Sequence, residues 1–283
     1  MPWIVFGLAA VFFSAISSLL QRVLMKDDKS DAYSYSVVFQ LLGAVVVGAF
    51  TVFSGNLKML PIGQYPINFL LLTVLYGAGT YCLFKAYRYL EASEITIVTA
   101  SRVIITISSA VLLLKEAFTL KQFSGTVLIL LSVVLISQGF GKLKLNRGVY
   151  YALGMALFYG IAITNDTYLL KHVNIYSYTA IGFLLPGLFL IIVNPKILFK
   201  LKAFFHRKLF SKMLILDICY GTSAIFFYKA IESGAKASQI TPILQSTVIL
   251  TVVLAAIFLK ERDHLAKKFI CAVLVTIGVL LLT

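Results

Sequence analysis

Charged side chains are scarce in this chain of 283 residues, and acidic ones are fewer than basic ones. Only 13% of the residues are charged and only 11 are Asp or Glu, whereas 60% are hydrophobic and the mean hydropathy is +0.95. Soluble domains carry about 25% charged and about 45–50% apolar residues. The composition therefore excludes an ordinary soluble protein and indicates an integral membrane protein.

Cysteine and histidine are also rare, which limits the chemistry that the chain can perform. Cys82, Cys219 and Cys271 lie inside apolar runs without the spacing of a disulfide framework or a metal site, so we expect them to serve in packing. The three histidines fall in expected loops, and the sequence has no HExxH, G-x-S-x-G or Walker motif. We therefore expect neither an enzyme nor an ATP-driven pump, and no metal or cofactor.

Long apolar runs, by contrast, fill the sequence. A bilayer core needs about 20 mostly apolar residues per helix. A window of that length predicts ten spans, centred near Ala10, Gly43, Val74, Ile105, Leu130, Gly160, Pro186, Gly221, Val248 and Leu274. The connections are short, so neighbouring spans should be antiparallel and little mass remains outside the membrane. The first run lacks the basic start and cleavage site of a signal peptide, so we expect it to be a retained span.

An internal repeat divides these spans into two sets. The stretch YGAGTYCLFKAYRYLEASEIT from Tyr76 matches YGTSAIFFYKAIESGAKASQIT from Tyr220, and LLLKE further along the first set matches IFLKE in the second. The repeat predicts a first half over residues 1–141 and a second over residues 142–283, together forming one membrane domain. Because five spans per half is an odd number, the second half should be inverted, as in many secondary transporters. The predicted fold class is an all-α membrane protein of ten transmembrane helices in two inverted five-helix repeats.

The repeated KA-x(n)-AS-x-I-T and LKE pattern resembles the drug/metabolite transporter superfamily, specifically its ten-helix EamA-type members. The resemblance implies alternating access and a central cavity lined by the first, third, fourth, sixth, eighth and ninth helices. It also implies substrates such as amino acids, nucleosides or sugars. Small multidrug relatives carry a membrane glutamate in the first helix, where this chain has only Ser14, Ser17, Ser18 and Gln21. Proton coupling taken over from those relatives is therefore not supported.

These observations predict a secondary transporter of a small polar or anionic metabolite in the cytoplasmic membrane, with export as one open direction. The expected partners are a small-molecule substrate and membrane lipid, and both a monomer and a homodimer stay open. Two alternatives remain: a flippase of an isoprenoid-phosphate or other lipid-linked carrier, and a non-transporting membrane scaffold. A polar pocket at the midplane favours transport, a lateral opening favours the flippase, and a dry packed core favours the scaffold.

The distribution of basic residues bears on nucleic-acid binding and on orientation. Of the 25 Lys and Arg residues, 18 fall near loops after odd-numbered spans, six near loops after even-numbered spans, and Arg102 is the remaining one. The net charge of +14 is thus spread over short loops, and the one dense cluster, Pro195 to Met213, is a single loop, so we expect no nucleic acid. The positive-inside rule places the chain termini outside the cell, whereas the family resemblance places them in the cytoplasm.

Arg102 is the most unusual residue, since it stands among about twenty uncharged residues of the predicted fourth span. A charge at that depth costs at least about 2.5–3.5 kcal/mol and therefore normally faces a cavity or a partner. In one interpretation Arg102 binds an anionic group of the substrate. In the other it pairs with Asp166 or Asp217, or extends toward the interface. Thr247 occupies the corresponding repeat position, so the site would be chemically asymmetric.

Further candidate binding residues come from the third and eighth spans. Lys85 and Lys229 are repeat equivalents that either extend to the interface or place two cations beside the cavity. Tyr81 and Tyr228 offer stacking surfaces next to them.

Two acidic residues and two polar ones complete the set of candidates. Asp166 and Asp217 are the carboxylates most deeply placed in spans, where each could carry a proton or neutralise a cation. Gln245 follows Pro242 in the ninth span and faces either a neighbouring helix or substrate. Gln40 of the second span is predicted to form a hydrogen bond between helices.

Overall fold

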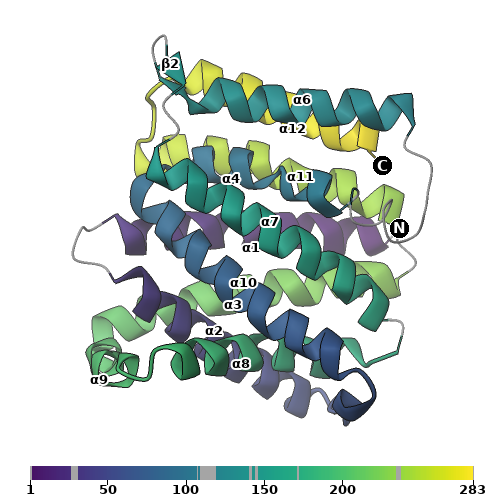
Figure 1. The fold of residues 1–283 in the computed structure, drawn as a ribbon, viewed down its shortest axis with the longest axis vertical. Coiled ribbons are helices and arrows are strands. Elements are labelled where there is room, and N and C mark those ends of the chain that lie inside the picture. Colours follow the sequence, from purple (N-terminus) through teal and green to yellow (C-terminus); the bar gives the residue numbers. More distant parts are fainter. Residues whose placement is uncertain are drawn as a thin grey trace.

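The protein, described here from a computed structural model, is almost entirely helical (Figure 1). The structure describes residues 2–26, 31–106, 108, 119–139, 142–143, 146–170, 172–233 and 237–282. The α-helices are α1 (Pro2–Met25), α2 (Ala32–Phe53), α3 (Pro66–Tyr89), α4 (Ala92–Thr99), α6 (Leu120–Ser137), α7 (Arg147–Leu169), α8 (Ile175–Val193), α9 (Ile197–Leu201), α10 (Arg207–Glu232), α11 (Ala237–Leu254) and α12 (Leu265–Leu282). The remaining elements are η1 (Ile62–Gln64), η2 (Lys202–Phe205), the π-helical η3 (Ala255–Leu259), and the paired two-residue strands β1 (Gln138–Gly139) and β2 (Lys142–Leu143).

Several helices are long and apolar enough to cross a membrane. Within the described residues, six meet both criteria, and they belong to α1, α2, α3, α7, α8 and α10. Two shorter apolar helices, Leu120–Ile136 and Ser246–Leu259, come from α6 and from the α11–η3 region. A multi-pass membrane protein is therefore confirmed, while the number of ten spans stays a prediction.

Local sequence signals explain where several of these helices begin. Asp31, Asn146 and Asn174 each accept a hydrogen bond from a backbone N–H of the first turn of α2, α7 and α8, respectively. Such caps satisfy donors that have no partner within the helix. Pro66 opens α3, where its missing N–H removes no helical hydrogen bond.

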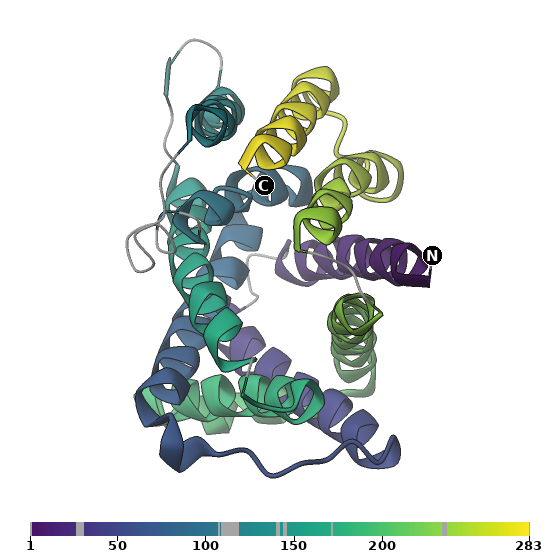
Figure 2. The same cartoon turned by 90° about the vertical axis from the view of Figure 1, so that its right-hand side faces the viewer.

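The helices lie in successive pairs along the long axis of the molecule. In both views, α6 and α12 lie together at one end, beyond α4 and α11, and α2 and α8 lie together at the other end (Figures 1 and 2). Between them, α3 packs along α7 and α1 packs along α10. The start of α1 and the end of α12 lie on the same side of the molecule (Figure 1).

The helix contacts keep their pattern when the two halves are exchanged. The helices that correspond are α1 with α7, α2 with α8, α3 with α10, α4 with α11, and α6 with α12. Under this exchange the α3–α7 contact becomes the α10–α1 contact, α3–α8 becomes α10–α2, and α4–α7 becomes α11–α1; all of these occur. The α2–α8 and α6–α12 pairs each join a helix to its own counterpart. The repeat seen in the sequence is thus also present in the packing.

Helices that correspond between the halves run in opposite directions. α3 and α7 are antiparallel, since Leu90 at the end of α3 lies against Gly148 at the start of α7, while Asn68 and Asn165 form a hydrogen bond of 2.7 Å at the opposite end. α1 ends beside the end of α3, because Arg22 donates to the Tyr87 carbonyl oxygen at 2.7 Å. The end of α1 therefore lies on the same face as the start of its counterpart α7.

The basic loop before α10 folds back onto the start of α2. Lys200 of α9 donates to Asp31 at 3.0 Å, and the side chain of Lys200 is 66% exposed. Partial burial raises the pKa of Asp31, but hydrogen bonds from Lys200 and Ser34 and the charge of Lys200 outweigh it, so the pKa lies below its usual value. This solvent-exposed ion pair contributes about 0–1 kcal/mol at most.

Candidate functional site

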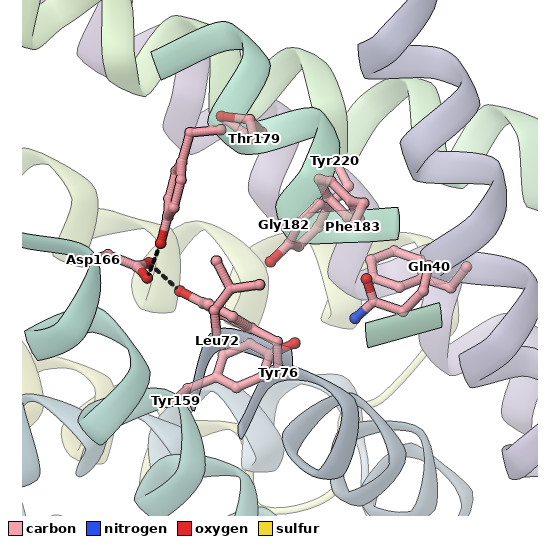
Figure 3. A pocket seen from close by; sticks show the side chains of 12 residues that line it. Gln40, Leu72, Tyr76, Tyr159, Asp166, Thr179, Gly182, Phe183 and Tyr220 are labelled. Carbon is pink, nitrogen blue, oxygen red and sulfur yellow. Dashed lines mark hydrogen bonds between the residues drawn. The ribbon is translucent and has the colours of Figure 1, made fainter. Parts of the chain in front are cut away.

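A cavity of about 110 Å³ lies between the two halves of the chain (Figure 3). Helices α2 and α3 of the first half and α7, α8 and α10 of the second contribute its lining residues: Phe39, Gln40, Leu72, Tyr76, Tyr159, Asp166, Tyr178, Thr179, Gly182, Phe183, Tyr220 and Ala224. The family resemblance assigned six helices to such a wall, of which the third, sixth and eighth, α3, α7 and α10, contribute to this lining, whereas the first, fourth and ninth, α1, α4 and α11, contribute none of its described residues. It did not assign the second and seventh helices, so the contributions of α2 and α8 are an addition.

Asp166 is the acidic group of this cavity and is held by two tyrosines. Its carboxylate oxygens accept hydrogen bonds of 2.5 Å each, from Tyr76 of α3 and Tyr178 of α8 (Figure 3). The side chain is buried, with 8% of the residue exposed. The carboxylate thus joins three helices from both halves of the chain.

A second polar chain crosses the cavity wall near Gln40. The Gln40 side chain donates to the Thr80 hydroxyl at 2.6 Å, and Thr80 shares a hydrogen bond of 2.8 Å with the Tyr159 hydroxyl. The predicted hydrogen bond of Gln40 between helices is therefore confirmed, since it joins α2 to α3. Gln40 and Asp166 lie on opposite sides of the close-up view (Figure 3).

Aromatic rings form most of the remaining wall. Phe39 lies against Tyr220 and Phe183, with ring centroids 5.1 and 6.0 Å apart, and Tyr76 lies against Tyr159 at 4.9 Å. All three pairs are arranged edge to face, the favoured geometry for aromatic side chains. The cavity is therefore lined by rings, with one carboxylate and a few hydroxyl and amide groups.

Arg102 stands at an interruption of the fourth helix. α4 ends at Thr99, and helical structure resumes at Arg102. Between them, the backbone N–H groups of Ser101 and Val103 donate hydrogen bonds to the carbonyl oxygens three residues earlier, as in a 3-10 turn. Gly160 of α7 makes this approach possible, since a Cβ added there would lie 2.9 Å from the Arg102 carbonyl oxygen. From the start of α4, ten residues of helical rise place Arg102 ~15 Å into the bundle.

The side chain of Arg102 is exposed. Its charge interacts electrostatically with the hydroxyl groups of Tyr87, Tyr159 and Tyr220, which come from α3, α7 and α10. Tyr159 and Tyr220 also line the cavity. The ion pairs of the described residues include neither Arg102 nor Asp166.

The predicted lysines lie away from this cavity. Lys85, half-buried in the last turns of α3, has its ammonium 5.7 Å from the ring centre of Tyr81 and 6.0 Å from that of Tyr151. Lys229 is half-buried in the last turn of α10. Because α3 and α10 run in opposite directions, the two lysines belong to opposite faces. Their role in binding stays a prediction.

The other candidates differ in what the structure describes of them. Thr247 is half-buried on α11. The side chains of Tyr228 and Gln245 lie outside the described part of the chain. Asp217 of α10 is 1% exposed, and neither of its carboxylate oxygens has a hydrogen-bond partner among the described residues. Of the residues predicted for substrate binding or proton coupling that have described side chains, Asp166 alone lines the cavity, and Gln40, predicted to join two helices, lines it as well.

A cluster of charged residues joins the halves at the face where α1 and α3 end. This charged cluster consists of Arg22, Glu91, Glu94, Glu261 and Lys268. Arg22 lies 3.4 Å from Glu261, whose other oxygen accepts from the Ala92 amide at 3.2 Å, and Lys268 binds the Glu91 carboxylate. Burial, followed by the charge of Glu91, raises the pKa of Glu261 above its usual value, although Arg22 and Lys268 act in the other direction.

Most cavity residues were not singled out from the sequence. Tyr76 and Tyr220 open the two matching stretches of the repeat, and both line the cavity. Their repeat equivalence was a usable signal, because a site between two related halves draws residues from equivalent positions. Tyr159, Tyr178 and Phe183 carried no such signal, since the chain has 15 Tyr and 22 Phe.

Comparison with known proteins agrees with the repeat and the fold. The sequence pattern of the EamA-like transporter family matches residues 1–138 and, a second time, residues 146–283. The boundary expected at residues 141 and 142 falls between the two matches. No curated protein matches the chain. One solved crystal structure superposes on it with a TM-score of 0.68 at 14% sequence identity, covering 100% of this chain and 96% of that chain, and this likeness concerns the fold alone. Since the two matches span nearly the whole sequence, the chain belongs to the EamA-like transporter family, and hence to the drug/metabolite transporter superfamily.

Proposed function

We propose that the protein is a secondary transporter that moves a small polar metabolite across the cytoplasmic membrane by alternating access. The observation that carries this proposal is the cavity with a buried carboxylate, lined by helices of both halves. A relative movement of two inverted halves can open such a site first to one side and then to the other. The cavity favours a transporter rather than a non-transporting scaffold, because a scaffold is expected to have a dry and fully packed interior.

The charged cluster supplies the contact that closes one face. It links α1 and the α3–α4 turn of the first half to Glu261 and α12 of the second half. Asp166 lies three residues before the end of α7, toward the opposite face. In the proposed cycle the residues of the charged cluster separate when the transporter opens toward the face on which the cluster lies. The excess of basic residues in loops on the cluster's face supports a cytoplasmic position for that face, with the termini outside.

The direct test is transport by the purified protein. Candidate ligands are selected from a metabolite collection by the increase they cause in the unfolding temperature, since a ligand of the native state stabilises it. Flux of each ligand is then measured in proteoliposomes, with liposomes lacking the protein as the control. We expect saturable flux of at least one ligand. A set of binding ligands without protein-dependent flux of any of them would contradict the proposed function.

Arg102 is proposed to bind an anionic group of the substrate beside Tyr159 and Tyr220. Arg102→Lys keeps the charge but loses the planar pair of donors, so we expect flux to fall about tenfold with protein abundance unchanged. Arg147→Lys, the same exchange at an exposed position at the start of α7, is the control and should keep its flux. Wild-type flux in Arg102→Lys would leave Arg102 with a structural role.

A further inference from the structure

The carboxylate of Asp166 faces a cavity, and no ion pair among the described residues includes it. The ion pairs among the described residues are Arg22–Glu261, Lys200–Asp31 and Lys268–Glu91. Asp166 instead accepts only the two tyrosine hydroxyls. A buried carboxylate is normally neutralised by a partner or by a proton. At this site a proton or a cationic ligand can supply the positive charge, and the two would compete for the same carboxylate.

The rings around the cavity supply a second attraction for positive charge. Six aromatic residues line it: Phe39, Tyr76, Tyr159, Tyr178, Phe183 and Tyr220. The faces of aromatic rings carry negative electrostatic potential and attract ammonium groups, most strongly where water is excluded. Phe39, Phe183 and Tyr220 contact one another at centroid distances of 5.1 to 6.0 Å, and therefore form a continuous apolar surface.

We propose that this cavity binds an organic cation: a substrate with an ammonium group that pairs with Asp166 and an apolar body that lies among the rings. The inference rests on the proposed transport function and specifies one chemical group of its substrate. Tyr76 and Tyr178 position the carboxylate between three helices, so that the ammonium group approaches an oriented acceptor. An anionic group placed beside Asp166 would face that charge and the negative ring faces, so the place proposed for an anionic group stays at Arg102, beside Tyr159 and Tyr220.

Three small probes of nearly the same shape test the charge preference without any mutation. Benzylamine is a cation at neutral pH, benzyl alcohol is neutral and benzoate is an anion. Binding of each to the wild-type protein in detergent is measured by isothermal titration calorimetry. We expect benzylamine to bind at least about tenfold more tightly than benzyl alcohol, as one charge-assisted contact provides, whereas binding of benzoate would involve Arg102 and not Asp166. Binding of benzylamine that is no tighter than that of benzyl alcohol would overturn the proposal.

Variants then locate the binding. Asp166→Asn keeps the size and the hydrogen-bonding capacity of the side chain but removes its charge, so we expect it to abolish the preference for benzylamine over benzyl alcohol. Asp217→Asn is the matched control, because it removes a second buried carboxylate that does not line the cavity, and it should keep the preference. Tyr220→Leu removes one ring and should weaken both probes. An unchanged preference in Asp166→Asn would place the cation elsewhere.

The outcome separates this inference from the proposed transport function. These titrations measure binding in detergent and need no flux. Charge-selective binding at Asp166 without flux of any ligand would contradict transport and leave the cation site in place. Flux of a metabolite without benzylamine preference would support transport and contradict the cation site.

Discussion

Replacing Lys268 by methionine is expected to lower the free energy of unfolding by about 3–5 kcal/mol, the usual cost of removing one partner from a buried ion pair. The Lys268 side chain is 3% exposed and binds Glu91, and its charge also acts on Glu94 and Glu261. Without it, Arg22 is the single cation left to oppose the three carboxylates of the charged cluster. The loss should shrink as the pH falls, because protonation removes the uncompensated negative charge.

The control is Lys200→Met, which removes the other lysine ion pair at an exposed position. The Lys200 side chain is 66% exposed, so the change should cost no more than about 1 kcal/mol. Both variants are compared by reversible unfolding in mixed detergent micelles. Equal losses in the two variants, or a loss in Lys268→Met that does not depend on pH, would contradict the role assigned to the charged cluster.

Asp217 gives the opposite expectation, since replacing it by leucine should raise the free energy of unfolding by about 2–4 kcal/mol. Each of its two buried oxygens has no partner among the described residues, and each such atom costs about 1–3 kcal/mol. Leucine has a similar branched shape without these polar atoms. A carboxylate kept at this cost indicates a function, so we expect the more stable variant to lose flux if Asp217 carries a proton during transport.

Asp166→Leu is the matched comparison for that change. It places the same side chain at the other buried carboxylate of the spans, but it leaves the hydroxyls of Tyr76 and Tyr178 without their acceptor. We expect it to destabilise the protein. If both leucine variants shift the free energy of unfolding in the same direction, the distinction between a bonded and an unbonded carboxylate is wrong.

The organisation into two halves could be predicted from the sequence, because Tyr-Gly, Lys-Ala and Ala-Ser-x-Ile-Thr recur with nearly constant spacing. Composition alone indicated the membrane, since the apolar runs match the length that a bilayer requires. The family assignment from the same residues is confirmed. These features are local or periodic and need no knowledge of which helices touch.

The site was harder to predict, because its contacts join residues that are distant in sequence. Asp166 was a candidate, but the tyrosines that hold it lie 90 and 12 positions away; only the place of Tyr76 in the repeat distinguishes it, and nothing in the sequence distinguishes Tyr178 from other tyrosines. Lys268 was counted only as a loop charge, although it binds Glu91, 177 positions away. A scan for long apolar runs finds spans and cannot show which helix ends meet.

Alternating access requires that the cavity can be reached from both sides of the membrane. In a variant without Cys82, Cys219 and Cys271, Ala224→Cys places one thiol in the cavity wall, and Ala272→Cys places one in the buried core as a control. Proteoliposomes of known orientation are treated with a membrane-impermeant maleimide applied outside, or enclosed inside. We expect the thiol at position 224 to react from either side and the thiol at position 272 from neither. Reaction of the thiol at position 224 from one side alone would contradict alternating access.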